Sequence, residues 1–243
     1  MTDHTNCLEQ LVIVLPSLDP DDKFDGVVQG LVDAGFAHVV IVDDGSDAAH
    51  QIHFDKAAQH PCCRVLHHGV NKGKGRALKT AFRCVLDELP EAAGVITIDG
   101  DGQHLLADII ACGERMLALG DAVVLGCRDF DAPGVPPRSV SGNKTTNRMF
   151  KLFFGITISD TQTGLRAIAR EHLPLMCRIE GERYEYETQM LLSLRDEGVG
   201  IGEVIIDTVY IDENQTSHFN AFRDSWKIYR LIFRHMLRRK RRR

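Results

Sequence analysis

The chain lacks the sequence features of several large protein classes. It has no C-x-x-C motif. It has seven cysteines, an odd number, and their spacing does not match that of a zinc site. It has no run of about 18 apolar residues, so we expect no membrane-spanning segment. The first residues, Met1–Asn6, are polar and lack the basic-then-apolar order of a signal peptide. These absences favour a cytoplasmic protein with reduced thiols.

The overall composition is typical of a globular protein. The chain has 243 residues, of which 44% are hydrophobic and 26% are charged, and this is enough to build one large core. No internal repeat or low-complexity linker divides it. We therefore predict one domain over residues 1–216, followed by an appended helix over residues 217–243.

Charge is distributed unevenly along the chain. Residues 223–243 contain ten Lys or Arg and one acid, a net charge of +9, whereas the remaining residues carry −14. This pattern favours an electrostatic anchor and not a nucleic-acid-binding surface. Aromatic and apolar side chains recur in the same tail at helical spacing, at Phe222, Trp226, Tyr229, Phe233 and Met236. Such a helix can lie on an anionic membrane, which would place the protein on the inner face of the cell membrane, or it can pack on the core.

Short apolar runs alternate with helical patterns in the first half. Strands are predicted at Leu11–Leu15, Val39–Val42, Arg64–Leu66, Val95–Ile98 and Ala122–Leu125. Helices are predicted between them at Asp21–Ala34, Ala48–Gln59, Gly75–Leu89 and Leu105–Leu119. The alternation predicts an α/β fold with a mostly parallel central sheet and helices on both faces. Ligands of such sheets bind at the carboxyl ends of the strands.

The second half begins with a Pro- and Gly-containing loop, Arg128–Ser141, which could act as a lid. After it we predict a helix, a strand, a second helix and a last strand, at Asn143–Phe154, Leu165–Ala169, Tyr186–Asp196 and Gly202–Ile211.

Two aspartates follow the predicted strand Val95–Ile98. Asp99 and Asp101 are one residue apart, and each is followed by a glycine, Gly100 and Gly102. Two like charges at a buried strand end repel each other, and a cation between them relieves the repulsion. Mg²⁺ and Mn²⁺ prefer oxygen ligands and often share their shell with substrate phosphates. The motif favours a metal–diphosphate site, although an Asp-Gly turn that only closes a strand has the same pattern.

Two further segments carry polar chemistry. Asp43 and Asp44 end a predicted strand, where one acid could bond a nucleobase or ribose hydroxyl, while Ser46 or Asp47 could cap the next helix. The segment Asn71–Ala77 opens a helix with glycines and three cations, which favours an anion. It has neither the Gly-Lys-Ser/Thr of a Walker loop nor the complete G-x-G-x-x-G of a dinucleotide site.

Five motifs occur in a specific order: V-D-D-G-S at 42–46, N-K-G-K-G-R-A at 71–77, D-G-D-G-Q-H at 99–104, G-C-R at 126–128 and D-T-Q-T-G-L-R at 160–166. Together they resemble the family 2 glycosyltransferases of GT-A fold, over nearly the whole chain. Within that family the chain looks like the dolichyl- and polyprenyl-phosphate mannosyl- and glucosyltransferases. The resemblance implies a nucleotide-sugar donor and a lipid-phosphate acceptor.

The resemblance also implies roles for matching residues on the donor side. Asp99, Gly100 and Asp101 match the D-x-D motif that binds the sugar nucleotide and the Mg²⁺ or Mn²⁺ ion, and Gln103 matches a residue of the metal shell. The base and ribose are expected at Pro16, Asp19, Asp43, Asp44, Lys72 and Gly73. The loop Pro16–Pro20 departs from the family's P-x-Y/L-N-E, so UDP and GDP both stay open.

On the acceptor side, Arg128 and Arg138 match arginines that hold the acceptor phosphate in the polyprenyl branch. If the acceptor is instead a sugar hydroxyl, as in cell-envelope polysaccharide synthesis, a carboxylate base is needed and Asp160 is the candidate. The segment Arg183–Glu187 resembles the family's acidic segment on the next helix, or else Glu185 or Glu187 serves only as a structural partner of Arg166. A non-catalytic, membrane-recruited protein that binds a nucleotide sugar is the remaining alternative.

Overall fold

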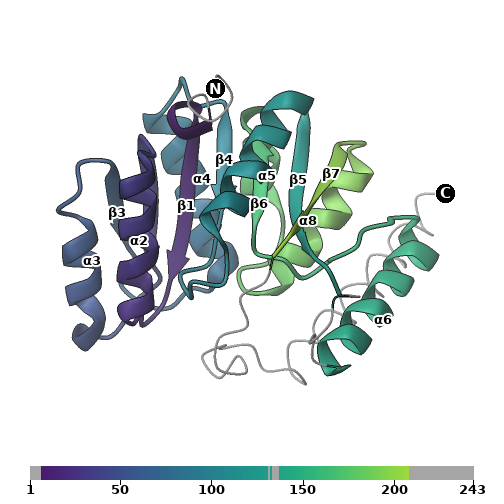
Figure 1. The fold of residues 1–243 in the computed structure, drawn as a ribbon, viewed down its shortest axis with the longest axis horizontal. Helices are drawn as coiled ribbons and strands as arrows, with labels where there is room; N and C mark the ends of the chain where they lie inside the picture. Colours follow the sequence, from purple (N-terminus) through teal and green to yellow (C-terminus); the bar gives the residue numbers. More distant parts are fainter. Residues whose placement is uncertain (1–6, 131, 133–136, 208–243) are drawn as a thin grey trace.

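The computed structural model of the chain describes residues 7–130, 132 and 137–207. Within them, one sheet has the strand order β3-β2-β1-β4-β6-β5-β7 (Figure 1). The strands are β1 (Leu11–Ser17), β2 (His38–Asp43), β3 (Cys63–His67), β4 (Gly94–Thr97), β5 (Ala122–Arg128), β6 (Arg166–Ala169) and β7 (Gly200–Ile206). Strand β6 is antiparallel to both of its neighbours, and the other pairs are parallel. The carboxyl ends of β1, β2, β4 and β5 therefore meet at one edge.

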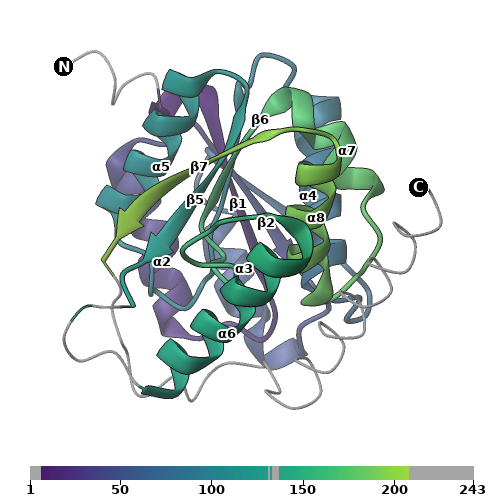
Figure 2. The same ribbon diagram turned by 90° about the vertical axis from the view of Figure 1, so that its right-hand side faces the viewer.

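Helices cover both faces of this sheet. One face carries α2 (Asp22–Ala34), α3 (Gln51–Ala57) and α5 (Leu106–Leu119), and the other carries α4 (Lys74–Glu88), α7 (Leu173–Arg178) and α8 (Glu185–Asp196). Figure 2 shows the sheet between α2 and α5 at the left and α4, α7 and α8 at the right. Further elements are α6 (Pro137–Phe154), two 3-10 turns, η1 (Ala48–His50) and η2 (Arg170–His172), and a short helical stretch at residues 7–10.

The central strand β1 explains why both faces need cover. Its residues are apolar without interruption from Leu11 to Leu15, and all five are fully buried. Val12 and Val14 pack in the core under α4, whereas Ile13 packs in the core under α2 and α5. Successive side chains of a strand point to opposite faces, so a continuous apolar run requires helices on both.

Helix α4 is fixed at both ends, and its N-terminus forms part of the site described below. It starts after Gly73, whose φ of 101° suits a residue without a Cβ. At the other end, Arg170 donates from Nη1 to the carbonyl oxygen of Leu89 (2.8 Å) and from Nη2 to that of Leu86 (3.1 Å). These bonds satisfy carbonyls that the last helical turn leaves without intrahelical partners.

The predicted fold class is confirmed, with some differences in the elements. The helix expected at Asn143–Phe154 begins earlier, at Pro137, so the prediction of a loop up to Ser141 is wrong. Proline suits the first turn of a helix, because its missing N–H has no partner there in any case. The helix expected at Ala48–Gln59 divides into η1 and α3, and α7 was not predicted.

Two sequence predictions lie partly or wholly outside the described residues. The appended helix over residues 217–243 is one, and the last part of the strand Gly202–Ile211 is the other. Among the described helices, none combines the length and the apolar character needed to cross a membrane.

Candidate active site

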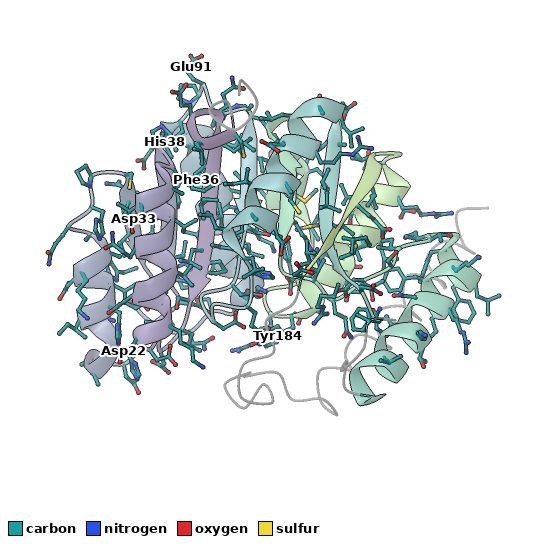
Figure 3. All side chains as sticks on the ribbon, viewed as in Figure 1. Asp22, Asp33, Phe36, His38, Glu91 and Tyr184 are labelled. Atoms are coloured by element: carbon teal, nitrogen blue, oxygen red, sulfur yellow. The ribbon has the colours of Figure 1, made fainter. Side chains whose placement is uncertain are left out.

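A cavity of about 580 Å³ lies at the carboxyl ends of β1, β2 and β4. Its walls come from the loop after β1, the end of β2, the start of α4, the segment after β4 and the loop before α8. The lining residues are Pro16, Ser17, Leu18, Asp19, Pro20, Asp21, Lys23, Asp44, Asn71, Gly73, Lys74, Ala77, Asp99, Gly100, Asp101, Arg183 and Tyr184. Figure 3 shows Tyr184 at the edge toward which β1 points, and Glu91 at the opposite edge.

Most donor-side residues proposed from the sequence line this cavity. They are Pro16, Asp19, Asp44, Gly73, Asp99, Gly100 and Asp101. Five other candidates lie outside its lining, namely Asp43, Lys72, Gln103, Arg128 and Asp160. Arg138 lies in the first turn of α6, and its side chain is outside the described part of the chain.

The Asp99 carboxylate is held between two basic side chains. Lys74 Nζ lies 2.7 Å from Asp99 Oδ1, and it also lies 3.2 Å from Glu187 Oε1. His104 Nε2 lies 3.8 Å from Asp99 Oδ2. Burial alone would raise the pKa of Asp99, but the Lys74 ammonium and the His104 imidazole hold it well below its ordinary value. Asp99 is therefore ionised at neutral pH.

Asp101 differs from Asp99 in its surroundings. Its Oδ1 accepts a hydrogen bond from the backbone N–H of Gln103 at 3.0 Å. Burial raises its pKa, and the negative charge of Asp99 raises it further. A divalent cation between the two carboxylates would remove this repulsion.

The residues around Asp99 fit a hard divalent cation. Gly164 lies against the Asp99 carboxylate, so closely that a Cβ there would collide with it. His104 Nε2 is buried and has no hydrogen-bond partner among the described residues. Two carboxylates with a neighbouring imidazole can supply part of a Mg²⁺ or Mn²⁺ shell, which substrate phosphate oxygens commonly complete.

Two groups of acidic and histidine side chains among the described residues have ligand atoms close enough together to share an ion, and Asp99, Asp101 and His104 do not form such a group. One is Asp22, Asp25 and His53, and the other is Asp121, Glu171 and His172. Neither contains a residue of the cavity lining. In the first, the Lys56 ammonium already lies 2.6 Å from Asp25 Oδ2.

Asp44 ties the basic loop before α4 to the end of β2. It is buried, and its carboxylate accepts from the backbone N–H of Gly73 (2.7 Å) and of Lys72 (3.0 Å). His68 Nδ1 lies 2.7 Å from the same carboxylate. Asp44 therefore lines the cavity and also holds the neighbouring loop in place.

Asp43 and Asp19 organise the neighbouring loops. Asp43 Oδ1 accepts from the backbone N–H of Ser46 at 2.8 Å, and its Oδ2 accepts from the Gln51 side chain at 3.0 Å. Asp19, with a left-handed φ of 49°, accepts from the backbone N–H of Asp47 at 2.9 Å. The bond between Asp47 and Asp19 joins the loop after β1 to the loop after β2. A non-glycine residue with positive φ is uncommon, and such residues cluster at ligand sites.

Arg128 and Asp160 form a two-bond ion pair at the end of β5. Arg128 Nε donates to Asp160 Oδ2 at 2.6 Å, and Nη2 donates to Oδ1 at 3.2 Å. Asp160 is fully buried, and the guanidinium also lies over the Phe130 ring, 5.0 Å from its centroid. One strand, β6, separates β5 from β4, so Arg128 stands about 10 Å along the sheet edge from the end of β4.

Sequence reasoning missed several side chains of this region. Lys74 is the second lysine of the basic motif, but its contact with Asp99 joins residues far apart in the chain. Arg183 and Tyr184 come from the loop before α8 and begin the segment Arg183–Glu187, whose resemblance to an acidic segment of the family assigned no role to these two side chains. Arg76 and Lys79 fasten this loop to α4 through the Glu182 carboxylate.

The expected pairing of Arg166 with an acidic side chain is wrong. Arg166 Nη1 donates to the backbone oxygen of Glu187 at 3.1 Å, and the Glu187 carboxylate contacts Lys74 instead. Glu185 Oε1 accepts from backbone N–H groups of its own loop.

Comparison with known proteins finds relatives that are similar over nearly the whole chain. The chain is 27% identical over 229 residues to an uncharacterized protein of Methanocaldococcus jannaschii, covering 92% of this chain and 91% of the relative. It is 24% identical over 239 residues to the UDP-N-acetylglucosamine–dolichyl-phosphate N-acetylglucosaminyltransferase of Methanococcus voltae, covering 91% and 94%.

Solved structures share the fold at low sequence identity. Mannosyl-3-phosphoglycerate synthase from Rubrobacter xylanophilus superposes with a TM-score of 0.68 at 20% identity, over 96% of this chain and 74% of that one. Glucosyl-3-phosphoglycerate synthase from Mycobacterium tuberculosis, in complex with Mn²⁺, uridine diphosphate and phosphoglyceric acid, gives 0.62 at 17% identity, over 88% and 75%.

The family model named Glycosyl transferase family 2 matches residues 25–174, which is more than half of the chain and includes the loop before α4, the Asp99–Asp101 segment and Arg128. The protein belongs to this family and is a glycosyltransferase of GT-A fold.

Proposed function

We propose that the protein transfers a sugar, with inversion, from a UDP- or GDP-linked donor to a polyprenyl- or dolichyl-type lipid phosphate. The observation that carries this proposal is the arrangement of charge along one sheet edge. The cavity is lined by the Asp99 and Asp101 carboxylates. Arg128 lies farther along the same sheet edge, and the buried carboxylate of Asp160 orients its guanidinium. The relative from Methanococcus voltae supports it, since its name specifies a UDP-linked donor and dolichyl phosphate.

The donor would occupy the cavity with its base toward the β1 and β2 loops. Pro16, Asp19, Asp44 and Gly73 line that end, with Lys72 and Asp43 behind them. Asp99 and Asp101, with Gln103 next to them, would hold Mg²⁺ or Mn²⁺. A bound divalent cation neutralises the charge that builds on the leaving diphosphate.

The acceptor phosphate would bind beside Arg128, with Arg138 as a second cation. A planar guanidinium that is already fixed loses little freedom when it binds phosphate oxygens. A phosphate monoester has its second pKa at about 6, so it is an ionised nucleophile at neutral pH and needs no strong base.

The geometry of Asp160 favours a lipid phosphate over a sugar hydroxyl. A hydroxyl acceptor needs a carboxylate within reach to take its proton. Asp160 was the candidate, but it is fully buried and both of its oxygens accept bonds from Arg128. We assign it the role of orienting Arg128.

A transfer assay tests the proposal. The protein is incubated with Mg²⁺ or Mn²⁺ and a panel of UDP- and GDP-sugars, with and without a short polyprenyl phosphate. We expect one donor to be consumed only when both the metal and the lipid phosphate are present. Donor binding that lipid phosphate does not convert into turnover would contradict the acceptor, and the absence of binding to every donor would contradict the donor class.

We further propose that the basic C-terminal residues bring the enzyme to its lipid substrate on an anionic membrane. Each Lys or Arg near such a surface contributes about 1 kcal/mol, so the ten basic residues of 223–243 would give strong binding. Replacing all ten by glutamine should release the full-length protein from vesicles containing anionic lipid in a sedimentation assay. Neutral vesicles are the control. Unchanged sedimentation of the glutamine variant with anionic vesicles would refute the anchor.

A further inference from the structure

The Lys74 ammonium lies on the carboxylate that the proposed metal would use. It is 2.7 Å from Asp99 Oδ1 and 3.2 Å from Glu187 Oε1, and its side chain is largely buried. We propose that Lys74 is a positioning residue that couples metal binding to diphosphate binding, because its ammonium competes with a divalent cation for Asp99 and the donor diphosphate withdraws it. This inference rests on the proposed donor site.

The competition between Lys74 and a metal ion for Asp99 follows from the charge and the position of the ammonium. An ammonium at 2.7 Å from Oδ1 neutralises Asp99 and occupies the space beside that oxygen. A cation that binds Asp99 must therefore displace Lys74 or share the carboxylate with it, and two neighbouring cations repel each other strongly in a site of low dielectric constant. Lys74 thus lowers the affinity of Asp99 and Asp101 for a metal ion alone.

Glu187 is a second carboxylate with which the Lys74 ammonium can pair. Its carboxylate comes from α8, a different element from the one that carries Asp99, and it contacts Lys74 at 3.2 Å. Lys74 also lines the cavity, whereas Glu187 does not. The ammonium can therefore move away from Asp99 and still be paired, with Glu187 or with an anion in the cavity.

A nucleoside diphosphate supplies that anion. Lys74 is the first residue of α4 and lines the cavity, so its ammonium and the positive end of the helix dipole both favour an anion there. Once the ammonium binds phosphate, Asp99 is available to the metal. By thermodynamic linkage, the metal must then strengthen nucleotide binding by the same factor.

Mn²⁺ binding in the absence of nucleotide, followed by electron paramagnetic resonance, tests this coupling. Lys74→Met should bind Mn²⁺ about 10-fold more tightly than the unmodified protein, a change within the usual range of coupled sites. Lys72→Met is the matched control, because it removes the same charge from the same loop without a contact to Asp99. Its Mn²⁺ affinity should change by less than about twofold, since exposed charges are well screened.

A second pair of variants probes the other partner of Lys74. Glu187→Gln leaves the ammonium more firmly on Asp99, so Mn²⁺ alone should bind more weakly. Glu185→Gln removes the same charge from the same helix without touching Lys74, and it should have little effect. Thermal unfolding of each variant checks that the fold is kept, and Lys74→Gln serves if Lys74→Met does not fold.

The outcomes separate this inference from the proposed function. Equal Mn²⁺ affinity in the unmodified protein and the Lys74→Met variant, with Mn²⁺-dependent nucleotide binding intact, would overturn the coupling role and leave the donor site standing. Equal tightening by Lys72→Met and Lys74→Met would also overturn it, since net charge would then explain the effect. No Mn²⁺ binding by any variant, with or without UDP or GDP, would instead refute the metal site itself.

Discussion

Asp101→Ala abolishes metal-dependent donor binding and lowers sugar transfer by about a thousandfold or more, if the cavity holds the donor as proposed. A bound metal ion contributes several kcal/mol of transition-state stabilisation, and each 1.36 kcal/mol is about a tenfold change in rate. The expected result is a loss of the increment in UDP or GDP binding that Mn²⁺ produces, measured by calorimetry. Asp101 lines the cavity and bonds only a backbone N–H among its described contacts, so the fold should survive.

The control for this prediction is a second acid outside the cavity. Asp121 belongs to the group with Glu171 and His172, whose ligand atoms lie close enough together to hold an ion. Asp121→Ala should leave Mn²⁺-dependent nucleotide binding and transfer unchanged. A loss of metal dependence in Asp121→Ala, with Asp101→Ala still responding to Mn²⁺, would move the metal from the cavity to that group.

The fold could be predicted because its main signal is local. An uninterrupted apolar run such as Leu11–Leu15 predicts a strand buried on both faces, and the helical pattern between such runs predicts parallel crossovers. The reversal of β6 could not be predicted in this way, because a strand buried on both faces has the same apolar composition in either direction. Helix α7 also escaped prediction, since it is only six residues long and follows a 3-10 turn.

The candidate site was predictable where one short motif holds all of its chemistry. Asp99 and Asp101 follow the end of β4 within four residues, so the sequence alone places them at the edge of the sheet. The partners of these acids come from other elements. Lys74 reaches Asp99 from α4, and Glu187 reaches Lys74 from α8. Only the packing of the two helices on one face of the sheet brings the three charges together.

The adjacent acids Asp43 and Asp44 show the same limit. Their sequence is consistent with either one contacting a base, but the alternation of a strand sends neighbouring side chains in different directions. Asp44 lines the cavity, while Asp43 turns to the loop of Ser46 and Gln51. The strand register, which the sequence does not specify to one residue, decides between them.

Arg128→Met is expected to lower kcat/KM for the lipid phosphate by about 100-fold, with nucleotide binding unaffected. A charge-assisted, two-bond contact between guanidinium and phosphate contributes roughly 3 kcal/mol, twice that of a neutral hydrogen bond or more. Arg128 lies outside the lining of the cavity proposed for the donor, so Mn²⁺-dependent binding of UDP or GDP should stay as in the unmodified protein. Steady-state kinetics at varied polyprenyl phosphate, together with calorimetry of the nucleotide, measure the two effects separately.

Asp160→Asn distinguishes an orienting carboxylate from a catalytic base. If Asp160 only holds Arg128, the asparagine oxygen still accepts one of the two bonds from the guanidinium. The loss in kcat/KM for lipid phosphate should then be smaller than the loss caused by Arg128→Met. The double variant should have the same kcat/KM as Arg128→Met alone, because the effects of two residues that act through one contact are not additive. Arg195→Met, which removes an exposed arginine paired with Asp196, is the control for surface charge. A loss in Asp160→Asn that multiplies with the loss in Arg128→Met would mean that Asp160 acts on the acceptor directly, and the case for a hydroxyl acceptor would return.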